Sequence, residues 1–260
     1  IKVKRSADMF VDDASLTVND RNPQTSAETI MEKTQKGISS WNKFLWISGG
    51  LLELTKTKYD NYMLFWCFSK IGTPYLCPME DIPTKTVQVL NQEGQPATIE
   101  RLPHDTGIRM LGVRKAGNLK EKEKFNHLLK KTVKFTSSVV ACPVKAHEIW
   151  EAYNTIYLAS VMYPLATTSL SFKQVEKLHK QLLPRLLTRM GYQSCFPRKI
   201  VFGPKFFGGI EAKDLECEQG AAKIQAILKH IRNDSTVGQA ARILIRWAQI
   251  QAGTSKPILE

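Results

Sequence analysis

Apolar and polar positions follow a different pattern in each half of the chain. In the first half, Met9 to Val11 and Ala14 to Val18 are short apolar runs typical of two strands, with two acidic residues at the bend between them. A helix is predicted from about Ser26 to Ile47, because a serine can cap its first turn and apolar residues then recur at helical spacing. The segment Ser48 to Gly50 ends this helix, since glycine adopts the left-handed backbone that closes helices.

Residues 51–114 have the pattern of short strands. Aromatic runs, scattered prolines and glycines, and the turn sequence "NQEGQP" favour hairpins in this region. Segments 98–102 and 108–113 have the composition of strands.

From Asn118 onward the pattern becomes helical. Apolar residues recur every three or four positions in three segments: 125–133, 149–157 and 175–187. A loop rich in proline and glycine follows, and two further helices are predicted over 217–231 and 236–252. The sequence therefore predicts an α+β fold. A first part of β-hairpins with one helix is divided near residues 114–118 from an all-helical second part.

Positive charge is concentrated in the helical half. The chain has a net charge of +13. Residues 112–134 carry a net charge of +6 and residues 173–205 a net charge of +7, so the rest of the chain is neutral. Segregated charge of this kind favours a polyanionic partner. The alternative is that these are basic helix faces that only contact solvent.

Cysteine spacing and apolar content limit the class of protein. The five cysteines include no CxxC pair, which argues against a disulfide framework and against a structural zinc site. We therefore expect reduced thiols in an intracellular protein, nuclear or cytoplasmic and not secreted. No apolar run approaches the ~20 residues that span a bilayer. No signal peptide is visible, so no membrane partner is expected.

Two adjacent carboxylates, Asp12 and Asp13, lie at the predicted bend near the start of the chain. Side by side they repel each other, and each raises the pKa of the other. A divalent cation removes this penalty, because Mg²⁺ prefers hard oxygen ligands. Such a pair, held by strands, suits two-metal phosphoryl transfer, in which one ion activates a hydroxyl and the other stabilises the leaving group.

The segment "MFVDDASL" resembles the F/Y-x-D-D catalytic hairpin of reverse transcriptases. Phe10 matches the aromatic position, and Asp12 and Asp13 match the acid pair. In this family the acid pair lies on the palm domain and holds the metal ions. The resemblance therefore implies that Asp12 and Asp13 are catalytic and metal-binding residues for two Mg²⁺ ions, with Mn²⁺ as the alternative.

The segment "SGGLLELTKTKY" resembles the small residues and the lysine that follow the palm helix in non-LTR elements. Lys56 is in register for the family's lysine, which lies near the phosphates of the incoming nucleotide, and it is the third catalytic residue that the resemblance implies. A flexible ammonium group with an adjustable pKa suits this role. Glu53 departs from the usual asparagine, and Lys58 is close enough to take the role of Lys56.

Two later segments continue the resemblance in the same order. "IRMLGVRKAGN" resembles the primer-grip hairpin between palm and thumb, with Leu111 and Gly112 at the matching positions. Glycine allows another backbone to approach closely, as a primer grip requires. The stretch "KIVFGPKFFGGIEAKDLECEQG" resembles one that follows the thumb in non-LTR-type elements, and we assign it no site.

The basic segments then correspond to the thumb, which follows a template–primer duplex through its phosphates without reading bases. The expected nucleic-acid-binding residues are Lys120, Lys124, Lys130, Lys131, Lys134, Lys173, Lys177, Lys180, Arg185 and Arg189. Trp150, Tyr153 and Tyr157 could stack on bases, but their helical spacing favours core packing.

The resemblance extends from about residue 6 to residue 250. It implies a partial palm over residues 1–114, a helical thumb over 115–195 and a helical extension over 196–260. The implied activity is that of an RNA-directed DNA polymerase, which extends a DNA primer on an RNA template with dNTPs. Both ends of the sequence look cut, and the family's third palm acid and its fingers are absent, so we expect this chain alone to be inactive. The alternative is a domesticated or decayed retroelement remnant that binds nucleic acid without catalysis.

Overall fold

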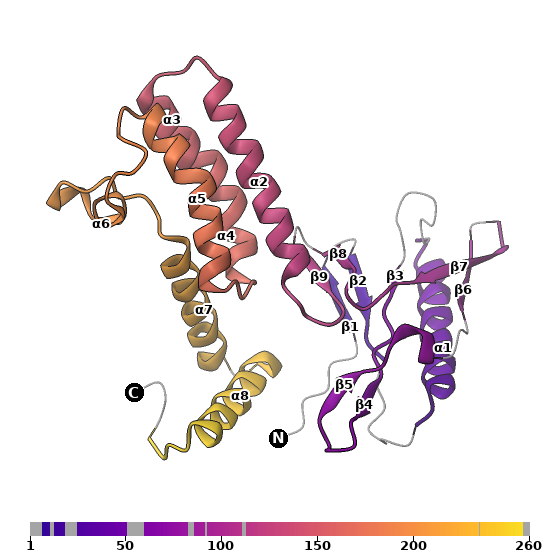
Figure 1. The fold of residues 1–260 in the computed structure, drawn as a ribbon. Coiled ribbons are helices and arrows are strands. Elements are labelled where there is room, and N and C mark those ends of the chain that lie inside the picture. The colour runs from indigo at the N-terminus through magenta and orange to yellow at the C-terminus, as the bar shows by residue number, and fades with distance from the viewer. Residues whose placement is uncertain are drawn as a thin grey trace. The chain divides into compact units, whose positions relative to one another are not determined.

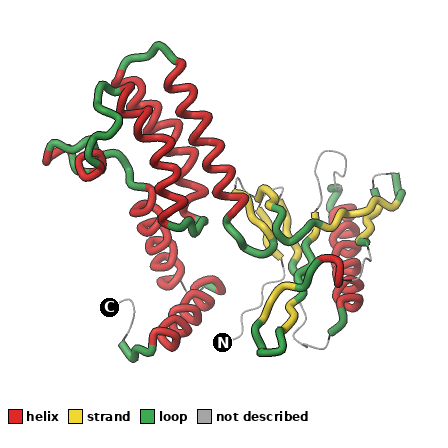
Figure 2. The backbone as a smooth tube through the Cα atoms, in the orientation of Figure 1, coloured by secondary structure: helices red, strands yellow, loops and turns green. Residues whose placement is uncertain are grey.

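The computed structural model describes residues 7–10, 13–18, 25–50, 60–82, 86–91, 93–110, 113–233 and 235–256. It combines helices with short strands, which confirms the predicted α+β class (Figure 1, Figure 2). The chain divides after Lys120 into two compact units. We call them the N-terminal unit, residues 5–120, and the helical unit, residues 121–260.

The N-terminal unit begins with an antiparallel hairpin and a long helix. Strand β1 (Ala7–Phe10) pairs with β2 (Asp13–Leu16) so that Phe10 lies opposite Asp13. Helix α1 (Ala27–Ile47) begins where predicted, because the Ser26 side chain accepts a hydrogen bond from the Thr29 amide (3.3 Å). It ends at Ser48, and Gly49 follows with a positive φ of 78°.

A three-stranded sheet packs on α1. Its strands are β3 (Asp60–Asn61), β7 (Pro96–Arg101) and β6 (Val87–Leu90), in the order β3-β7-β6. β6 and β7 form the predicted hairpin around "NQEGQP", since the Asn91 side chain accepts hydrogen bonds from the amides of Glu93 and Gln95.

The contact between α1 and β6 contains the small core of this unit. Its buried residues are Met31, Val87, Val89 and Ile99. Beside it, the Gln35 amide bonds both backbone groups of Gln88: Nε2 donates to the carbonyl (2.6 Å), and Oε1 accepts from the N–H (2.8 Å). A helix side chain thus satisfies polar groups of the β6 backbone that would otherwise lack partners.

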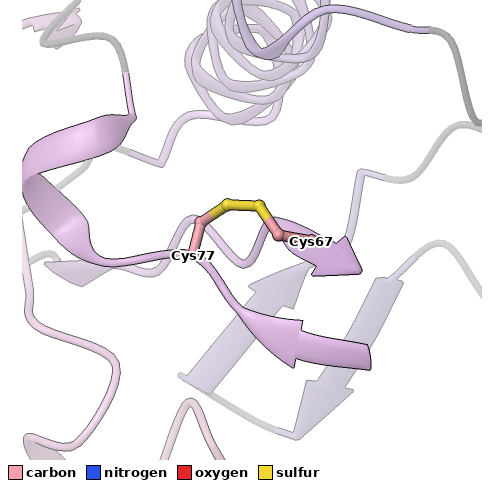
Figure 3. The surroundings of a disulfide bond; sticks show 2 residues. All are labelled: Cys67 and Cys77. Atoms are coloured by element: carbon pink, nitrogen blue, oxygen red, sulfur yellow. A yellow bond between two sulfur atoms is a disulfide. The ribbon is translucent and has the colours of Figure 1, made fainter. Parts of the chain in front are cut away.

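A second hairpin carries a disulfide. Strands β4 (Trp66–Phe68) and β5 (Pro74–Leu76) pair with Cys67 opposite Tyr75, and Cys67 bonds Cys77, two residues further along (Figure 3). The Cα atoms of the two cysteines are 5.7 Å apart, within the ordinary range for a disulfide. The prediction of five reduced thiols was therefore wrong for this pair, because the hairpin register, which spacing alone does not reveal, brings the two residues together. Cys142, Cys195 and Cys217 are free and exposed.

The last strands of the unit form a third hairpin, β8 (Gly107–Met110) with β9 (Val113–Ala116). Tyr62 anchors it, because its hydroxyl donates to the Thr106 carbonyl (2.5 Å). Gly117 lies so close to the Tyr62 ring that an added Cβ would come within 3.0 Å of it. A short 3₁₀ turn, η1 (Met79–Asp81), completes the unit.

The helical unit contains a bundle that the sequence pattern predicted well. Helix α2 (Lys122–Ala141) and helix α5 (Phe172–Arg189) lie side by side (Figure 1), and the segment between them is α3 (Ala146–Ala152), the π-helical η2 (Tyr153–Leu158) and α4 (Ala159–Ala166). The predicted apolar positions of α5 all lie in the core: Val175, Leu178, Leu182, Leu186 and Leu187.

The middle segment of the bundle buries every fourth residue. These residues are Ile149, Tyr153, Tyr157, Val161 and Leu165. In an α-helix each step of four residues rotates the side chain by about 40°, so such a row would turn away from the core. The wider π-helical turn offsets this rotation. It also explains why Ile156, an apolar residue at helical spacing within the segment 149–157, is exposed instead of buried.

The chain then forms a compact turn and two further helices. The turn consists of helix α6 (Arg198–Phe202) and the 3₁₀ turn η3 (Lys205–Phe207). The two helices are α7 (Leu215–Arg232) and α8 (Thr236–Ala252), and their bounds are close to those predicted. Gly238 contacts the carbonyl oxygens of His230 and Asn233, where a side chain would not fit. α7 packs on α4, which joins it to the bundle core.

Candidate nucleic-acid interface

The acid pair lies at the turn of the β1–β2 hairpin. Because Phe10 pairs with Asp13, only Val11 and Asp12 connect the two strands. The backbone of Asp13 begins β2, whereas Asp12 and the Asp13 side chain lie outside what the structure describes. The prediction of two paired strands is confirmed, Asp13 belongs to β2, and the metal-binding role stays a prediction.

The other residues predicted in the N-terminal unit belong to segments that the structure leaves undescribed. Lys56 lies in 51–59, and Leu111 and Gly112 form the two-residue connection between β8 and β9. The strands β8 and β9 on either side pair as a hairpin, as the resemblance to the primer-grip hairpin implied, whereas the single strand predicted over 108–113 was wrong. Among the described residues, no group of three or more His, Cys, Asp or Glu side chains could hold a metal ion.

The basic residues of α2 separate into two kinds. Lys130 and Lys134 are one turn apart and exposed, and their ammonium groups make no hydrogen bond or ion pair with another described residue. Lys124 is buried and pairs with Glu121 (2.9 Å) and the Thr167 carbonyl (3.3 Å). Lys131 is half-buried and donates to the Ser160 carbonyl (3.0 Å). Lys124 and Lys131 thus hold α2 to α4 and its end, and of these four lysines only Lys130 and Lys134 can contact a ligand freely.

Three lysines form one exposed face of α5. Lys173, Lys177 and Lys180 follow the i, i+4, i+7 spacing that places side chains on the same side of a helix. Lys177 lies over the Phe125 ring of α2, with its Nζ 5.8 Å from the ring centroid. Lys180 pairs with Glu176 on the surface (2.8 Å), an exposed contact that a phosphate can replace at little cost.

The two arginines of α5 differ in whether backbone carbonyls already bind their guanidinium groups. Arg185 is exposed and contacts only the Gln181 side chain (3.3 Å) among described residues. Arg189 donates to the carbonyls of Val139 (3.2 Å), Cys142 (2.5 Å) and Val144 (3.3 Å). Because α-helix ends leave carbonyls unpaired, Arg189 stabilises the C-terminus of α2. Arg189 is therefore not counted among the residues available to a ligand.

Lys120 is exposed but belongs to the N-terminal unit, at the point where the chain divides. The predicted basic residues that are exposed on the helical bundle, which we call the bundle surface, are Lys130, Lys134, Lys173, Lys177, Lys180 and Arg185.

The three aromatic residues considered for base stacking pack in or against the bundle core, as predicted. Tyr153 and Tyr157 are buried and stacked, and Trp150 packs on Tyr153. Burial raises the pKa of Tyr157 to about 12, although the hydrogen bond with Thr132 opposes the shift. Burial likewise raises the pKa of Tyr153. Both phenols therefore stay protonated at neutral pH and act as packing groups.

The proline- and glycine-rich stretch, to which we assigned no site, has a structural explanation. Gly209 lies against the backbone of Gly203, where a side chain would not fit, and Gly208 has a positive φ of 79°. Gln219 is buried and bonds both backbone groups of Leu170: Oε1 accepts from its N–H (3.0 Å), and Nε2 donates to its carbonyl (3.1 Å). Sequence reasoning missed the contacts of Gln219 because they join segments about fifty residues apart.

No described helix is long and apolar enough to cross a bilayer. No protein-family model matches this chain, and no match exists among the curated proteins or the solved structures that were compared with it. The resemblance to reverse transcriptases therefore depends on the sequence motifs alone.

Proposed function

We propose that this chain is part of an RNA-directed DNA polymerase, comprising the rear of the palm and the thumb. The observation that carries the proposal is the register of the β1–β2 hairpin, which leaves only Val11 and Asp12 between the strands and begins β2 at Asp13. In this proposal, so short a connection would keep the two adjacent carboxylates close together, as a catalytic metal site requires.

The order of the following elements supports the same function. A long helix, α1, follows the acid hairpin, and a tight hairpin with Leu111 and Gly112 at its turn precedes the helical unit. In the proposal, Asp12 and Asp13 hold Mg²⁺, Lys56 lies near the nucleotide phosphates, and Leu111 and Gly112 approach the primer backbone. The bound metal ions would supply activation of the primer 3′ hydroxyl and stabilisation of the leaving pyrophosphate.

The helical unit would hold the duplex. The bundle surface presents six cationic side chains on two adjacent helices, and three of them, Lys130, Lys134 and Lys173, have no competing partner among described residues. Lysine and arginine neutralise phosphates without reading bases, and an RNA–DNA hybrid is recognised mainly by its shape and backbone. This surface suits a polymerase that must accept any sequence.

The test is primer extension on an RNA template by the full-length protein with Mg²⁺ and dNTPs. Asp12→Asn removes a metal-binding carboxylate and is expected to abolish extension. Asp8→Asn is the matched control, because Asp8 lies in the same hairpin, opposite Ser15 in β2, and is expected to leave extension unchanged.

Extension that survives Asp12→Asn contradicts the catalytic assignment. Hybrid binding by the full-length wild-type protein without any extension favours the second candidate, a polymerase-derived protein that binds nucleic acid without chemistry.

A further inference from the structure

The 3₁₀ turn η3 presents two aromatic rings to solvent in the helical unit. The side chains of Phe206 and Phe207 are 90% and 81% exposed, and their rings meet edge to face with centroids 5.0 Å apart. No other phenylalanine among the described residues is as exposed. Phenylalanine rings are normally buried, so an exposed pair is a feature that needs an explanation.

The backbone holds this pair outward. Three hydrogen bonds connect the residues after the turn to α6 and its end: the Ile210 amide to the Ile200 carbonyl (3.0 Å), the Ala212 amide to the Val201 carbonyl (2.9 Å), and the Glu211 amide to the Gly203 carbonyl (2.9 Å). Val201, Ile210 and Ala212 belong to the bundle core. The turn is thus anchored on both sides, and the two rings are exposed by a well-bonded local structure.

The segment that precedes the rings in the sequence is basic. Residues 198–207 contain Arg198, Lys199 and Lys205 and no acidic residue. Arg198 and Lys199 make no ion pair with any described residue. Lys205 lies 4.0 Å from Glu211, with both side chains largely exposed, and 5.9 Å from the centroid of the Trp150 ring. Residues 198–207 therefore carry a net charge of +3, and Glu211 pairs with one of these three cations.

We propose that η3 with its basic flank is a binding site for unpaired nucleotides of a single-stranded nucleic acid. Exposed aromatic faces stack on bases of any identity, and neighbouring cations hold the phosphates between them. Charge complementarity favours this ligand over an apolar protein groove, which would gain nothing from the three cations. The site differs from the bundle surface, which has lysines but no exposed aromatic pair.

The inference goes beyond the polymerase proposal and does not depend on catalysis. The lysines of α2 and α5 would bind the phosphates of a duplex, whereas Phe206 and Phe207 require bases that are not paired. The two sites are therefore tested with different ligands, and either can fail while the other stands.

The experiment measures fluorescence anisotropy of a labelled single-stranded oligonucleotide of about 12 nucleotides, long enough for one site of this kind. A second oligonucleotide of equal length has abasic sites throughout, so it keeps the phosphates and lacks the bases. The test variant, Phe206→Leu with Phe207→Leu, keeps apolar side chains and removes the aromatic faces. Phe68→Leu, at an exposed ring of β4, is the matched control.

We expect the double leucine variant to bind the ordinary oligonucleotide about tenfold more weakly than wild type. Its affinity for the abasic oligonucleotide and its melting temperature should equal those of wild type, because both rings are already exposed. Phe68→Leu should change neither affinity.

Three outcomes overturn the proposal. The double variant could bind the ordinary oligonucleotide as tightly as wild type, or it could lose affinity equally for the abasic one. In the third outcome, both wild type and the leucine variant sediment with phosphatidylserine vesicles, and oligonucleotide binding is the same in the two proteins. That result identifies a lipid surface as the partner.

Discussion

The two units of the molecule bury their apolar side chains to different extents. In the helical unit one core runs from α2 through α7 and includes most of the large apolar residues of the bundle. In the N-terminal unit the buried cluster is four residues between α1 and the sheet, while Phe44, Trp46, Trp66 and Phe68 are exposed. Since buried apolar area provides most of the stabilisation of a fold, the helical unit should be the more stable of the two.

The proposed catalytic and duplex-binding residues also belong mostly to different units. The residues that we propose for chemistry, Asp12, Asp13 and Lys56, belong to the unit with the small core, and those proposed to hold the duplex belong mostly to the unit with the large one. Mobile segments and functional loops are commonly drawn from the less stable parts of a protein. A rigid helical surface suits backbone binding, because it keeps lysines at fixed spacing.

The largest effect is expected for Leu182→Ala in the bundle core. Leu182 is fully buried on α5, so its truncation should lower the free energy of unfolding of the helical unit by about 3 kcal/mol. Urea unfolding followed by circular dichroism measures the loss. Amide exchange of β6 and β7 serves as the control and should not change. Faster exchange in both units would mean that they unfold together, which would contradict the expected difference in stability between them.

The next effect concerns the Cys67–Cys77 disulfide. Replacing both cysteines with serine should destabilise the N-terminal unit by up to about 3 kcal/mol, on the chain-entropy estimate for a loop of this size. Amide exchange should accelerate around β4 and β5 and stay unchanged in α2 and α5. Serine at Cys142, Cys195 and Cys217 is the control, since these thiols are free. An equal effect of both replacements would refute a stabilising disulfide.

A smaller effect distinguishes the two arginines of α5. Arg189→Met keeps the apolar stem and removes the hydrogen bonds to three carbonyls near the end of α2, so the free energy of unfolding should fall by about 2 kcal/mol. Arg185→Met should change it by less than about 0.5 kcal/mol, because that side chain is exposed. Thermal unfolding compares the two variants. Similar losses would contradict the structural role of Arg189.

The smallest effect is a pH dependence at His179. Burial lowers the pKa of this imidazole below its ordinary value of 6.5; Arg198 acts in the same direction, and Asp214 opposes it. Its Nε2 accepts a hydrogen bond from the Leu215 amide (3.3 Å), which requires the neutral form. Below pH 6.5 the unfolded chain takes up the proton more readily than the folded chain. Stability should therefore be retained above this pH and decrease as the pH falls below it.

The measurement compares urea midpoints on either side of that pH. In His179→Gln, which keeps an acceptor and does not titrate, the decrease should be smaller than in wild type. His147→Asn is the control, because His147 is exposed on α3. A decrease of wild-type size in His179→Gln would assign the effect to other groups.

The sequence predicted the helices well because burial on one face leaves a regular pattern. Leu178, Leu182 and Leu186 mark the buried face of α5 directly. The pattern failed at Ile156, where a π-helical turn changes the residues per turn. Helical periodicity thus predicts which side chains are buried only where the number of residues per turn is constant.

The sequence could not distinguish the roles of similar basic residues. Lys124 and Lys130 look alike in the sequence, yet one is buried against Glu121 and the other is exposed. The difference depends on which carbonyl or carboxylate tertiary packing brings near, and no local pattern encodes that. The Cys67–Cys77 pair was missed for the same reason, since it depends on the register of β4 and β5.

The central claim is that duplex binding depends on the exposed lysines of the helical unit. The most direct test measures how the affinity for an RNA–DNA hybrid changes with salt concentration for Lys130→Gln with Lys134→Gln, and for the matched pair Lys36→Gln with Lys43→Gln on exposed positions of α1. If each α2 lysine contacts one phosphate, the slope of log K against log salt should become shallower by roughly 2 in the first variant and stay unchanged in the second. Equal slopes in wild type and the α2 variant, or the same change in both variants, would contradict the claim.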